Sequence, residues 1–255
     1  METYLSSVKN SCHLLKLFLG TSKELGVTDI SKRLGLSKGA VHKLLITLES
    51  EGLIRQNPAN KQYSLGYTLL ELGNKVLVDH NMVEFARPHL KTLAATTREL
   101  VCLCVIDGKD AIYVDKIDSQ YPIRFDIEVY RRFPLYATSA SRSILAFQPE
   151  EWIDSVVLSE ELRTFTPHSL KQPAEIKQRL QTIRERGYEV SSNLRNVGVT
   201  GIAAPIFDTA GQAIAAVSTI GPTDRMLVSE KEWIEAVLFT TRSISSELGY
   251  KAGLS

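Results

Sequence analysis

Residues 27–52 read VTDISKRLGLSKGAVHKLLITLESEG, and this stretch decides the fold of the N-terminal part of the chain. Thr28 is a typical N-cap residue for a short helix, in which Ile30 and Leu34 share one face because they are four residues apart. Gly35 predicts the end of that helix, since glycine readily adopts the left-handed conformation that terminates helices. The first half of the stretch is therefore expected to form a short helix with one apolar face.

A second helix is predicted directly after this turn. Ser37 can cap its first turn, and Gly52 marks its end. The apolar side chains at helical spacing between them are Val41, Leu44, Leu45 and Leu48. Two helices joined by a tight turn that contains a glycine are typical of the helix-turn-helix, whose second helix enters the major groove of DNA.

The flanking residues extend the motif in both directions. Residues 6–20 predict a preceding helix, with apolar positions at Val8, Cys12, Leu15 and Leu19. Residues 53–66 contain two short β-prone runs around a turn-forming NPAN sequence, which is typical of a β-hairpin wing. Residues 67–80 predict a connecting helix weakened at Gly73. We therefore expect a winged helix-turn-helix over residues 1–66, a linker helix over 67–80 and a larger domain over 81–255.

The second helix of the motif presents polar side chains opposite its buried leucines. Lys38 and His42 are four residues apart, as are Gly39 and Lys43, so they share the outward face. Lysine and histidine donate to base edges, while a helix N-terminus suits a phosphate. The predicted DNA-binding residues, including those of the wing, are Ser37, Lys38, Gly39, His42, Lys43, Arg55, Asn60, Lys61 and Gln62. Each exposed lysine by itself is explained as a solvated charge. The order of a short helix, a glycine turn, a serine-capped helix and a basic wing favours DNA binding.

The distribution of charge agrees with this interpretation. The chain carries a net charge of +1, but residues 1–66 hold nine lysines and arginines against five acids, a balance of +4. The remainder must then balance at −3, since +1 minus +4 is −3. A basic small domain joined to a mildly acidic larger one is typical of a DNA reader attached to a sensor.

Beyond residue 80 the pattern changes to mixed helices and strands. The predicted helices cover residues 83–98, residues 173–186 and a C-terminal stretch, and the predicted strands cover 100–106, 111–117, 123–127 and two buried runs within 201–222. Asp107 and Gly108 favour a hairpin turn between the first two strands. Ser229 and Glu232 form a capping-box pattern ahead of the C-terminal helix. The fold class predicted is α+β.

Composition disfavours several other classes of protein. No apolar run approaches about 18 residues, and the N-terminus lacks a signal-peptide pattern, so a cytoplasmic protein with no membrane partner is expected. Alternation places Cys102 and Cys104 on one strand face, with no second Cys or His pair at metal-ligand spacing.

The sequence also contains no motif of a nucleotide-binding loop, a zinc peptidase or a serine hydrolase. A non-enzymatic protein with no cofactor is therefore expected. Two alternatives stay open at this stage: an enzyme, or an architectural protein that binds DNA without sensing a ligand. The latter would not need so large a domain beyond the helix-turn-helix.

Six stretches of the chain resemble the IclR family of bacterial transcription regulators, in the family's order. They are residues 7–66, with GLSKGAVHKLLITLESEGLIRQ and YSLG; RPHLKTLAATT at 87–97; PLYATSASRSILA at 134–146; IRERGYEV at 183–190; GVTGIAAPIFD at 198–208; and AAVSTIGP at 215–222. The resemblance implies a C-terminal effector-binding domain, similar to GAF-type sensors, with a curved antiparallel sheet flanked by helices. It also implies homodimers or dimers of dimers on double-stranded operator DNA, acting as repressors or activators.

Carried over by motif position, the resemblance places the effector-binding residues at Ser139, Ala140, Arg142, Ser191, Gly201, Ser218 and Ile220. Tyr136, Ser141 and Arg142 stand where the family often has His, Gly and Lys, and Gly201 replaces a frequent Cys. The segment YATSASRS is expected to begin a helix whose N–H groups point toward an anion, which predicts a carboxylate-bearing effector. The alternative is that Ser139, Ser218 and Tyr136 satisfy local backbone groups.

Overall fold

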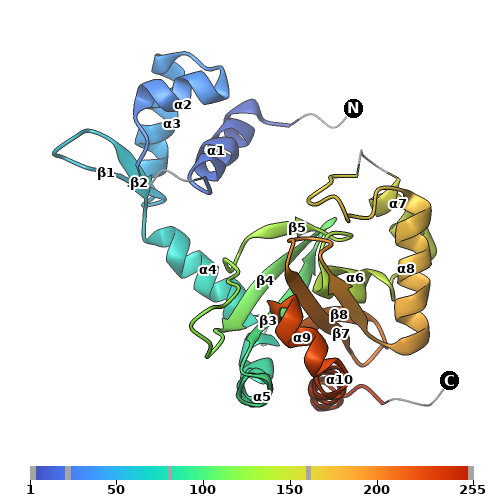
Figure 1. Ribbon diagram of the computed structural model, residues 1–255. Helices are drawn as coiled ribbons and strands as arrows, with labels where there is room; N and C mark the ends of the chain where they lie inside the picture. Colours follow the sequence, from blue (N-terminus) through green and yellow to red (C-terminus); the bar gives the residue numbers. More distant parts are fainter. Residues whose placement is uncertain (1–3, 21–23, 80–81, 159–161, 252–255) are drawn as a thin grey trace. The chain divides into compact units, whose positions relative to one another are not determined.

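The structure is a computed structural model, and it describes residues 4–20, 24–79, 82–158 and 162–251 (Figure 1). The chain divides into two compact units, Met1–Asn81 and Met82–Ser255. The first unit has one hydrophobic core and the second has two. None of the described helices is long and apolar enough to cross a membrane.

The first unit is a winged helix-turn-helix, as the sequence predicted. Its elements are α1 (Ser6–Leu17), α2 (Val27–Leu34), α3 (Lys38–Ser50), the antiparallel strands β1 (Ile54–Gln56) and β2 (Tyr63–Leu65), and α4 (Thr68–Asp79). Gly35 ends α2 with a φ of 66°, and the Ser37 hydroxyl accepts from the backbone N–H of Ala40 at 3.2 Å. Glycine is needed at position 35 because other side chains clash with the backbone at this φ. These two residues set the angle between α2 and α3.

Two details of the first unit differ from the prediction. On α1 the buried side chain is Leu14, followed by Phe18 in the turn, whereas Val8 and Leu19 are 56% and 79% exposed. Apolar residues occur on two faces of this helix, and only packing against α2 and α3 selects one. Thr28 lies inside α2, whose N-cap position is Gly26, with no side-chain cap.

Helix α4 runs without a break through Gly73, where the sequence predicted a helix that is interrupted or weakened. The space around this glycine is open, because a Cβ built there has no neighbour within 4 Å. A single glycine in a helix costs about 1 kcal/mol relative to alanine, which is too little to break a helix of this length. The last residue of the predicted linker, His80, lies outside the described residues.

The second unit is built on a six-stranded sheet in the order β5-β4-β3-β8-β7-β6, in which every neighbouring pair is antiparallel. The strands are β3 (Leu100–Asp107), β4 (Asp110–Ile117), β5 (Arg132–Pro134), β6 (Glu189–Ser192), β7 (Val199–Phe207) and β8 (Ala213–Pro222). The helices are α5 (Met82–Thr97), α6 (Ser139–Leu145), α7 (Glu150–Val157), α8 (Pro173–Arg186), α9 (Thr223–Val228) and α10 (Glu230–Glu247). This is the predicted α+β domain with a curved antiparallel sheet (Figure 1).

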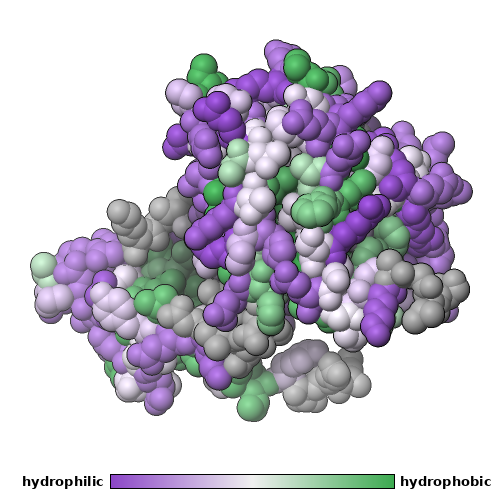
Figure 2. All heavy atoms as spheres, turned by 90° about the horizontal axis from the view of Figure 1, so that it is seen from below, coloured by the Kyte–Doolittle hydropathy of each residue, from purple (hydrophilic) through white to green (hydrophobic). Residues whose placement is uncertain are grey.

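Both faces of the sheet are covered. Val101 and Leu103 of β3 belong to the core shared with α5, α9 and α10, whereas Cys102 and Cys104 belong to the core shared with α6, α7 and α8. The alternation of side chains along a strand explains this division. Hydrophilic side chains predominate on the face drawn in Figure 2, with hydrophobic ones interspersed among them.

Two predictions for the second unit were wrong. Residues 123–127 do not form a strand; they belong to an irregular segment, and the edge strand of the sheet is instead β5. Ser229 and Glu232 do not form a capping box, because the Ser229 side chain makes no cap hydrogen bond. A capping box does form between Thr138 and Ser141 at α6, and at α8 the Glu175 carboxylate accepts from the backbone N–H of Gln172.

Candidate functional site

The predicted DNA-binding residues of α3 form one exposed surface. Ser37, Lys38, Gly39, His42 and Lys43 are all exposed, while Val41, Leu45 and Leu48 on the opposite face are buried in the core of the unit. A sixth residue, Ile46, is 52% exposed on this helix and was missed by sequence reasoning, which expected apolar side chains to be buried. The surface therefore combines two lysines and a histidine with one aliphatic side chain.

The wing presents its predicted residues in two different ways. Lys61 and Gln62 are exposed at its tip, and the Arg55 guanidinium donates to the Ser64 hydroxyl at 3.1 Å and stacks over the Tyr67 ring. Asn60 instead organises the wing: its amide donates to Glu24 at 2.7 Å, and its side-chain oxygen accepts from the N–H of Gln62. The hydrogen bonds from Asn60 and Asn57 lower the pKa of Glu24, which keeps this carboxylate charged beside the wing.

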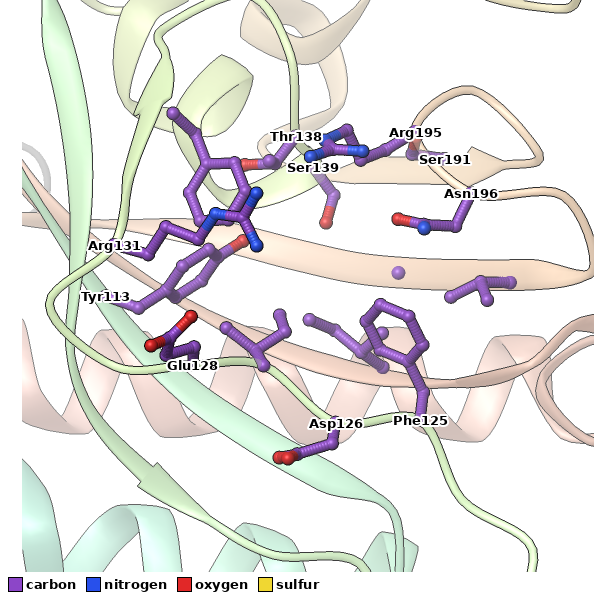
Figure 3. A pocket seen from close by; sticks show the side chains of 15 residues that line it. Tyr113, Phe125, Asp126, Glu128, Arg131, Thr138, Ser139, Ser191, Arg195 and Asn196 are labelled. Atoms are coloured by element: carbon purple, nitrogen blue, oxygen red, sulfur yellow. The ribbon is translucent and has the colours of Figure 1, made fainter. Parts of the chain in front are cut away.

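A cavity of about 200 Å³ lies in the second unit between the sheet and the segment that precedes β5. Four predicted effector-binding residues line it: Ser139 at the start of α6, Ser191 on β6, Gly201 on β7 and Ile220 on β8. The register of the sheet places Gly201 directly opposite both Ser191 and Ile220. Residues from four separate elements thus meet at one cavity (Figure 3).

Gly201 leaves room for this cavity. A Cβ built on Gly201 would lie 2.5 Å from the Ser139 hydroxyl oxygen and 3.6 Å from a carbon of Ile220. The first distance is much shorter than a van der Waals contact, so any larger residue here must displace the start of α6 or fill the cavity. This is the role that the sequence predicted for the glycine.

Three other predicted residues do not line the cavity. Ala140 and Ser218 are fully buried because α6, which carries Ala140, packs directly on β7 and β8, and Ser218 lies on β8. The Ser218 hydroxyl finds no hydrogen-bond partner in the described part of the chain. The assignment of Ala140, Arg142 and Ser218 as cavity residues is therefore corrected.

Arg142 is a structural residue. Its side chain is 1% exposed and donates to the Tyr136 carbonyl at 2.9 Å, to the Glu189 carboxylate at 3.1 Å and to the Ser191 hydroxyl at 2.7 Å. Burial lowers the pKa of Arg142, while the adjacent Glu189 raises it. The carboxylate of Glu189 is also contacted by Arg179 of α8. Arg142 therefore connects α6 to β6 rather than facing a ligand.

The start of α6 carries its own cap, which satisfies part of its backbone N–H groups. Thr138 accepts from the N–H of Ser141, and the Ser141 hydroxyl accepts from the N–H of Thr138. The N–H of Arg142 bonds to the Thr138 carbonyl. The expectation that the N–H groups of this segment would point toward an anion is thus met for neither Ser141 nor Arg142.

The remaining residues around the cavity come from irregular segments and from β4, β5 and β7. They are Tyr113, Phe125, Asp126, Ile127, Glu128, Arg131, Phe133, Thr138, Arg195, Asn196 and Val199. Sequence periodicity carried no signal for the loop residues among them, because irregular backbone has no repeat. Burial raises the pKa of Tyr113 well above its usual value, so this phenol stays protonated and can donate a hydrogen bond.

A helix-turn-helix with an exposed polar recognition face, together with an α+β domain that contains a small cavity, defines a ligand-responsive transcription regulator. Family comparison specifies the class. The IclR helix-turn-helix domain matches residues 7–58, and the C-terminal domain of bacterial IclR transcriptional regulators matches residues 74–246. The chain belongs to the IclR family of transcriptional regulators, which carry a DNA-binding helix-turn-helix and a C-terminal effector-binding domain.

Curated relatives agree along almost the whole chain. The HTH-type transcriptional regulator KdgR of Dickeya chrysanthemi is 33% identical over 243 residues, which cover 93% of this chain and 80% of that protein. The HTH-type transcriptional regulator XynR of Escherichia coli (strain K12) is 32% identical over 249 residues, covering 97% of this chain and 99% of that protein. Both relatives are transcription regulators.

Solved structures have the same fold. The Thermotoga maritima IclR structure has a TM-score of 0.77 at 29% identity and covers 97% of this chain and 100% of that one. An IclR homologue from Microbacterium hydrocarbonoxydans, complexed with 4-hydroxybenzoate, has a TM-score of 0.84 at 21% identity, covering 95% and 99% of the two chains. At this lower identity the similarity establishes the fold alone.

The structural role of Arg142 generates a stability prediction. Replacement by methionine leaves the fully buried Glu189 without one of its cationic partners, and breaking a buried ion pair costs about 3–5 kcal/mol. We expect Arg142→Met to lower the free energy of unfolding in urea by up to about 3–5 kcal/mol, because Arg179 still pairs with Glu189. The matched control is Arg132→Met, because Arg132 pairs with Asp107 at the surface, where ion pairs contribute about 0–1 kcal/mol. Equal, small effects of the two substitutions would contradict this role.

Proposed function

We propose that this regulator binds operator DNA through the outward face of α3 and the wing, and that a small carboxylate-bearing effector in the cavity of the second unit changes its operator affinity. In this proposal residues 1–66 read DNA, residues 67–80 link the domains and residues 81–255 bind the effector, in a cytoplasmic protein. The observation that supports it most is the cavity in the second unit, which an architectural DNA-binding protein would not need.

The chemistry of α3 suits base recognition in the major groove. Lys38, His42 and Lys43 offer hydrogen-bond donors for guanine or phosphate oxygens, and Ile46 adds an aliphatic side chain that can contact a thymine methyl group. The Ser37 cap leaves the N-terminal turn of the helix ordered, which suits a backbone phosphate. The wing residues Lys61 and Gln62 then lie where positioning contacts to the DNA backbone are expected.

Substitutions of two lysines separate the recognition of bases from electrostatic contacts to the DNA backbone. We expect Lys43→Ala to cost about 1–3 kcal/mol of operator binding and to relax base preference at one position, since it removes a groove contact. Lys61→Ala should weaken binding to all duplexes alike and reduce the salt dependence by about one charge.

The measurement is footprinting and titration against duplexes selected from a random pool, at several salt concentrations. Lys32→Ala serves as a control, because Lys32 is exposed on α2 rather than on α3 or the wing. If no duplex competes better than random DNA at any salt concentration, sequence-specific recognition by this surface is wrong.

We further propose that the chain acts as a homodimer or a dimer of dimers. A single recognition helix covers only a few base pairs, so specific binding needs two copies on a two-fold axis. Apolar side chains at the start of the chain favour this: Tyr4, Leu5 and Val8 are 68%, 74% and 56% exposed. On α4, Leu70 and Leu72 are also more than half exposed. Clustered exposed apolar side chains are typical of interaction surfaces.

Sedimentation equilibrium tests this assembly. We expect dimers or tetramers at micromolar concentration, and dissociation when Leu5 and Val8 are both replaced by Glu, because a charge is costly to bury in an interface. The control is a variant in which Phe239 and Leu227, exposed on α10 and α9 of the other unit, are both replaced by Glu. This variant should keep the oligomeric state of the wild type. A wild-type protein that sediments only as a monomer would exclude the dimer.

The size of the cavity suits a ligand with one ring or a short chain. A cavity of about 150 Å³ can hold benzene, and the volume here is about 200 Å³. The 4-hydroxybenzoate bound by the Microbacterium homologue is of this size class. To act on transcription, an effector must bind the DNA-competent and DNA-free conformations with different affinity; a tenfold change in operator affinity needs about 1.4 kcal/mol of coupling.

Gly201 tests whether the cavity is the effector site. We expect Gly201→Leu to abolish effector binding and effector-dependent operator release, because the new side chain fills the cavity. Ser218→Ala should leave both unchanged, since Ser218 lies beneath α6 and outside the cavity. Calorimetry with small carboxylates, including 4-hydroxybenzoate, measures the affinities.

Gly201→Ala is the milder variant and should weaken the affinity partly, through the close approach to Ser139. Circular dichroism shows whether each variant is folded. A folded Gly201→Leu protein with unchanged affinity and operator release would mean that the effector binds elsewhere.

A further inference from the structure

Two arginines approach one end of the cavity from different segments. Arg131 lies just before β5, and Arg195 lies in the loop between β6 and β7. Figure 3 shows both guanidinium groups on the same side of the cavity as the Ser139 hydroxyl and the Asn196 amide, with Phe125 opposite. The carboxylates of Asp126 and Glu128 lie on the side of Phe125 in the same view.

Aromatic rings hold these two arginines in place. The Arg195 guanidinium lies 4.2 Å from the centroid of the Phe165 ring and 5.3 Å from that of Phe133, and Arg131 lies 5.7 Å from the Phe133 centroid. Stacking on a ring uses the face of a guanidinium and leaves the N–H groups at its edge free to donate. Because both guanidinium groups contact the Phe133 ring, this ring places the N–H donors of Arg131 and Arg195 near each other.

The charge of this arginine pair is not neutralised by the carboxylates on the cavity wall. Asp126 bonds to Lys116 at 2.5 Å and points away from the arginines (Figure 3). Glu128 also lines the cavity, and in the described part of the chain it forms no ion pair with either arginine. Burial lowers the pKa of Arg195, and the charges of Arg131 and Arg163 lower it further, so the charges that act most on it are repulsive. Its Nε is buried without a hydrogen-bond partner among the described residues. Such an arrangement favours an anion from outside the chain.

Ser191 adds a donor at the same end. Its hydroxyl oxygen accepts from Arg142 at 2.7 Å, so its own hydrogen is directed elsewhere and is available to a ligand in the cavity. The buried Arg142 thus acts on the cavity indirectly. The apolar side chains of Phe125, Ile127 and Ile220 also line the cavity.

We propose that Arg131 and Arg195 together bind the carboxylate of the effector, and that they make the site selective for anionic over neutral ligands, while Phe125, Ile127 and Ile220 hold the apolar body. This inference rests on the proposed function, in which the cavity is the effector site. It places the anion beside the two guanidinium groups.

The test compares carboxylates with their neutral amides, which have nearly the same shape. Calorimetry on the full-length protein uses benzoate, 4-hydroxybenzoate, butyrate and succinate, each paired with the corresponding amide. The proteins are wild type, Arg131→Gln, Arg195→Gln and the matched control Arg132→Gln, since Arg132 pairs with Asp107 and does not line the cavity. Thermal unfolding checks that all variants are folded.

We expect at least one wild-type carboxylate to bind about tenfold or more tightly than its amide, because hydrogen bonds to charged groups are stronger than neutral ones. Arg195→Gln and Arg131→Gln should each reduce this preference, and Arg132→Gln should retain it. The affinity for the amides should change little. A panel in which no carboxylate binds better than its amide overturns the proposal, as does a preference that survives in both arginine variants.

The Gly201→Leu variant separates this failure from a failure of the proposed function. If Gly201→Leu abolishes binding while both arginine variants keep the preference, the cavity is the effector site and the arginines do not select its charge. If Gly201→Leu leaves carboxylate binding unchanged, the cavity is not the effector site and both proposals fail.

Discussion

The buried pair between Arg142 and Glu189 is the interaction on which the cavity depends. It joins the helix that begins at the cavity to the edge strand that forms one of its walls, and Arg179 extends it to α8. Buried charges are tolerated only when they are paired and hydrogen-bonded, and Arg142 meets this condition through a carboxylate, a hydroxyl and a backbone carbonyl. Because Ser191 is one of these partners, the geometry of the cavity wall follows from the geometry of the pair.

Small residues on the central strands make the rest of the arrangement possible. Ala203 and Ala216 lie under α6, and Gly201 lies at the point where its first turn meets the sheet. Close packing of a helix on a sheet requires such residues, since larger side chains would hold the layers apart. The space that remains beside Gly201 is closed by the irregular segment before β5 rather than by a helix. Regular structure therefore supplies the rigid half of the cavity, and loops supply most of its chemistry.

The two units obtain their order from different physical sources. The first is small, and its helix boundaries depend on local signals, a glycine in the left-handed conformation and a serine cap. Its single core consists chiefly of leucine and isoleucine side chains. The second depends on long-range pairing of six strands, whose alternating side chains supply two cores at once. This difference explains why exposed polar residues of α3 can serve DNA recognition without disturbing the core beneath them, while a change at the cavity must affect the sheet and α6 together.

The sequence by itself determined the winged helix-turn-helix, the α+β class of the second unit, and the helix from Pro173 to Arg186, because caps, turns and periodicity are local properties of the chain. Through its resemblance to family motifs it also predicted four residues that line the cavity, Ser139, Ser191, Gly201 and Ile220. Only the tertiary structure decided that Arg142 is buried, since its partner Glu189 is 47 residues away and no local pattern specifies that contact. The same holds for Arg131 and Arg195, which come from irregular segments and meet only because the sheet brings β5 and the loop after β6 around one cavity.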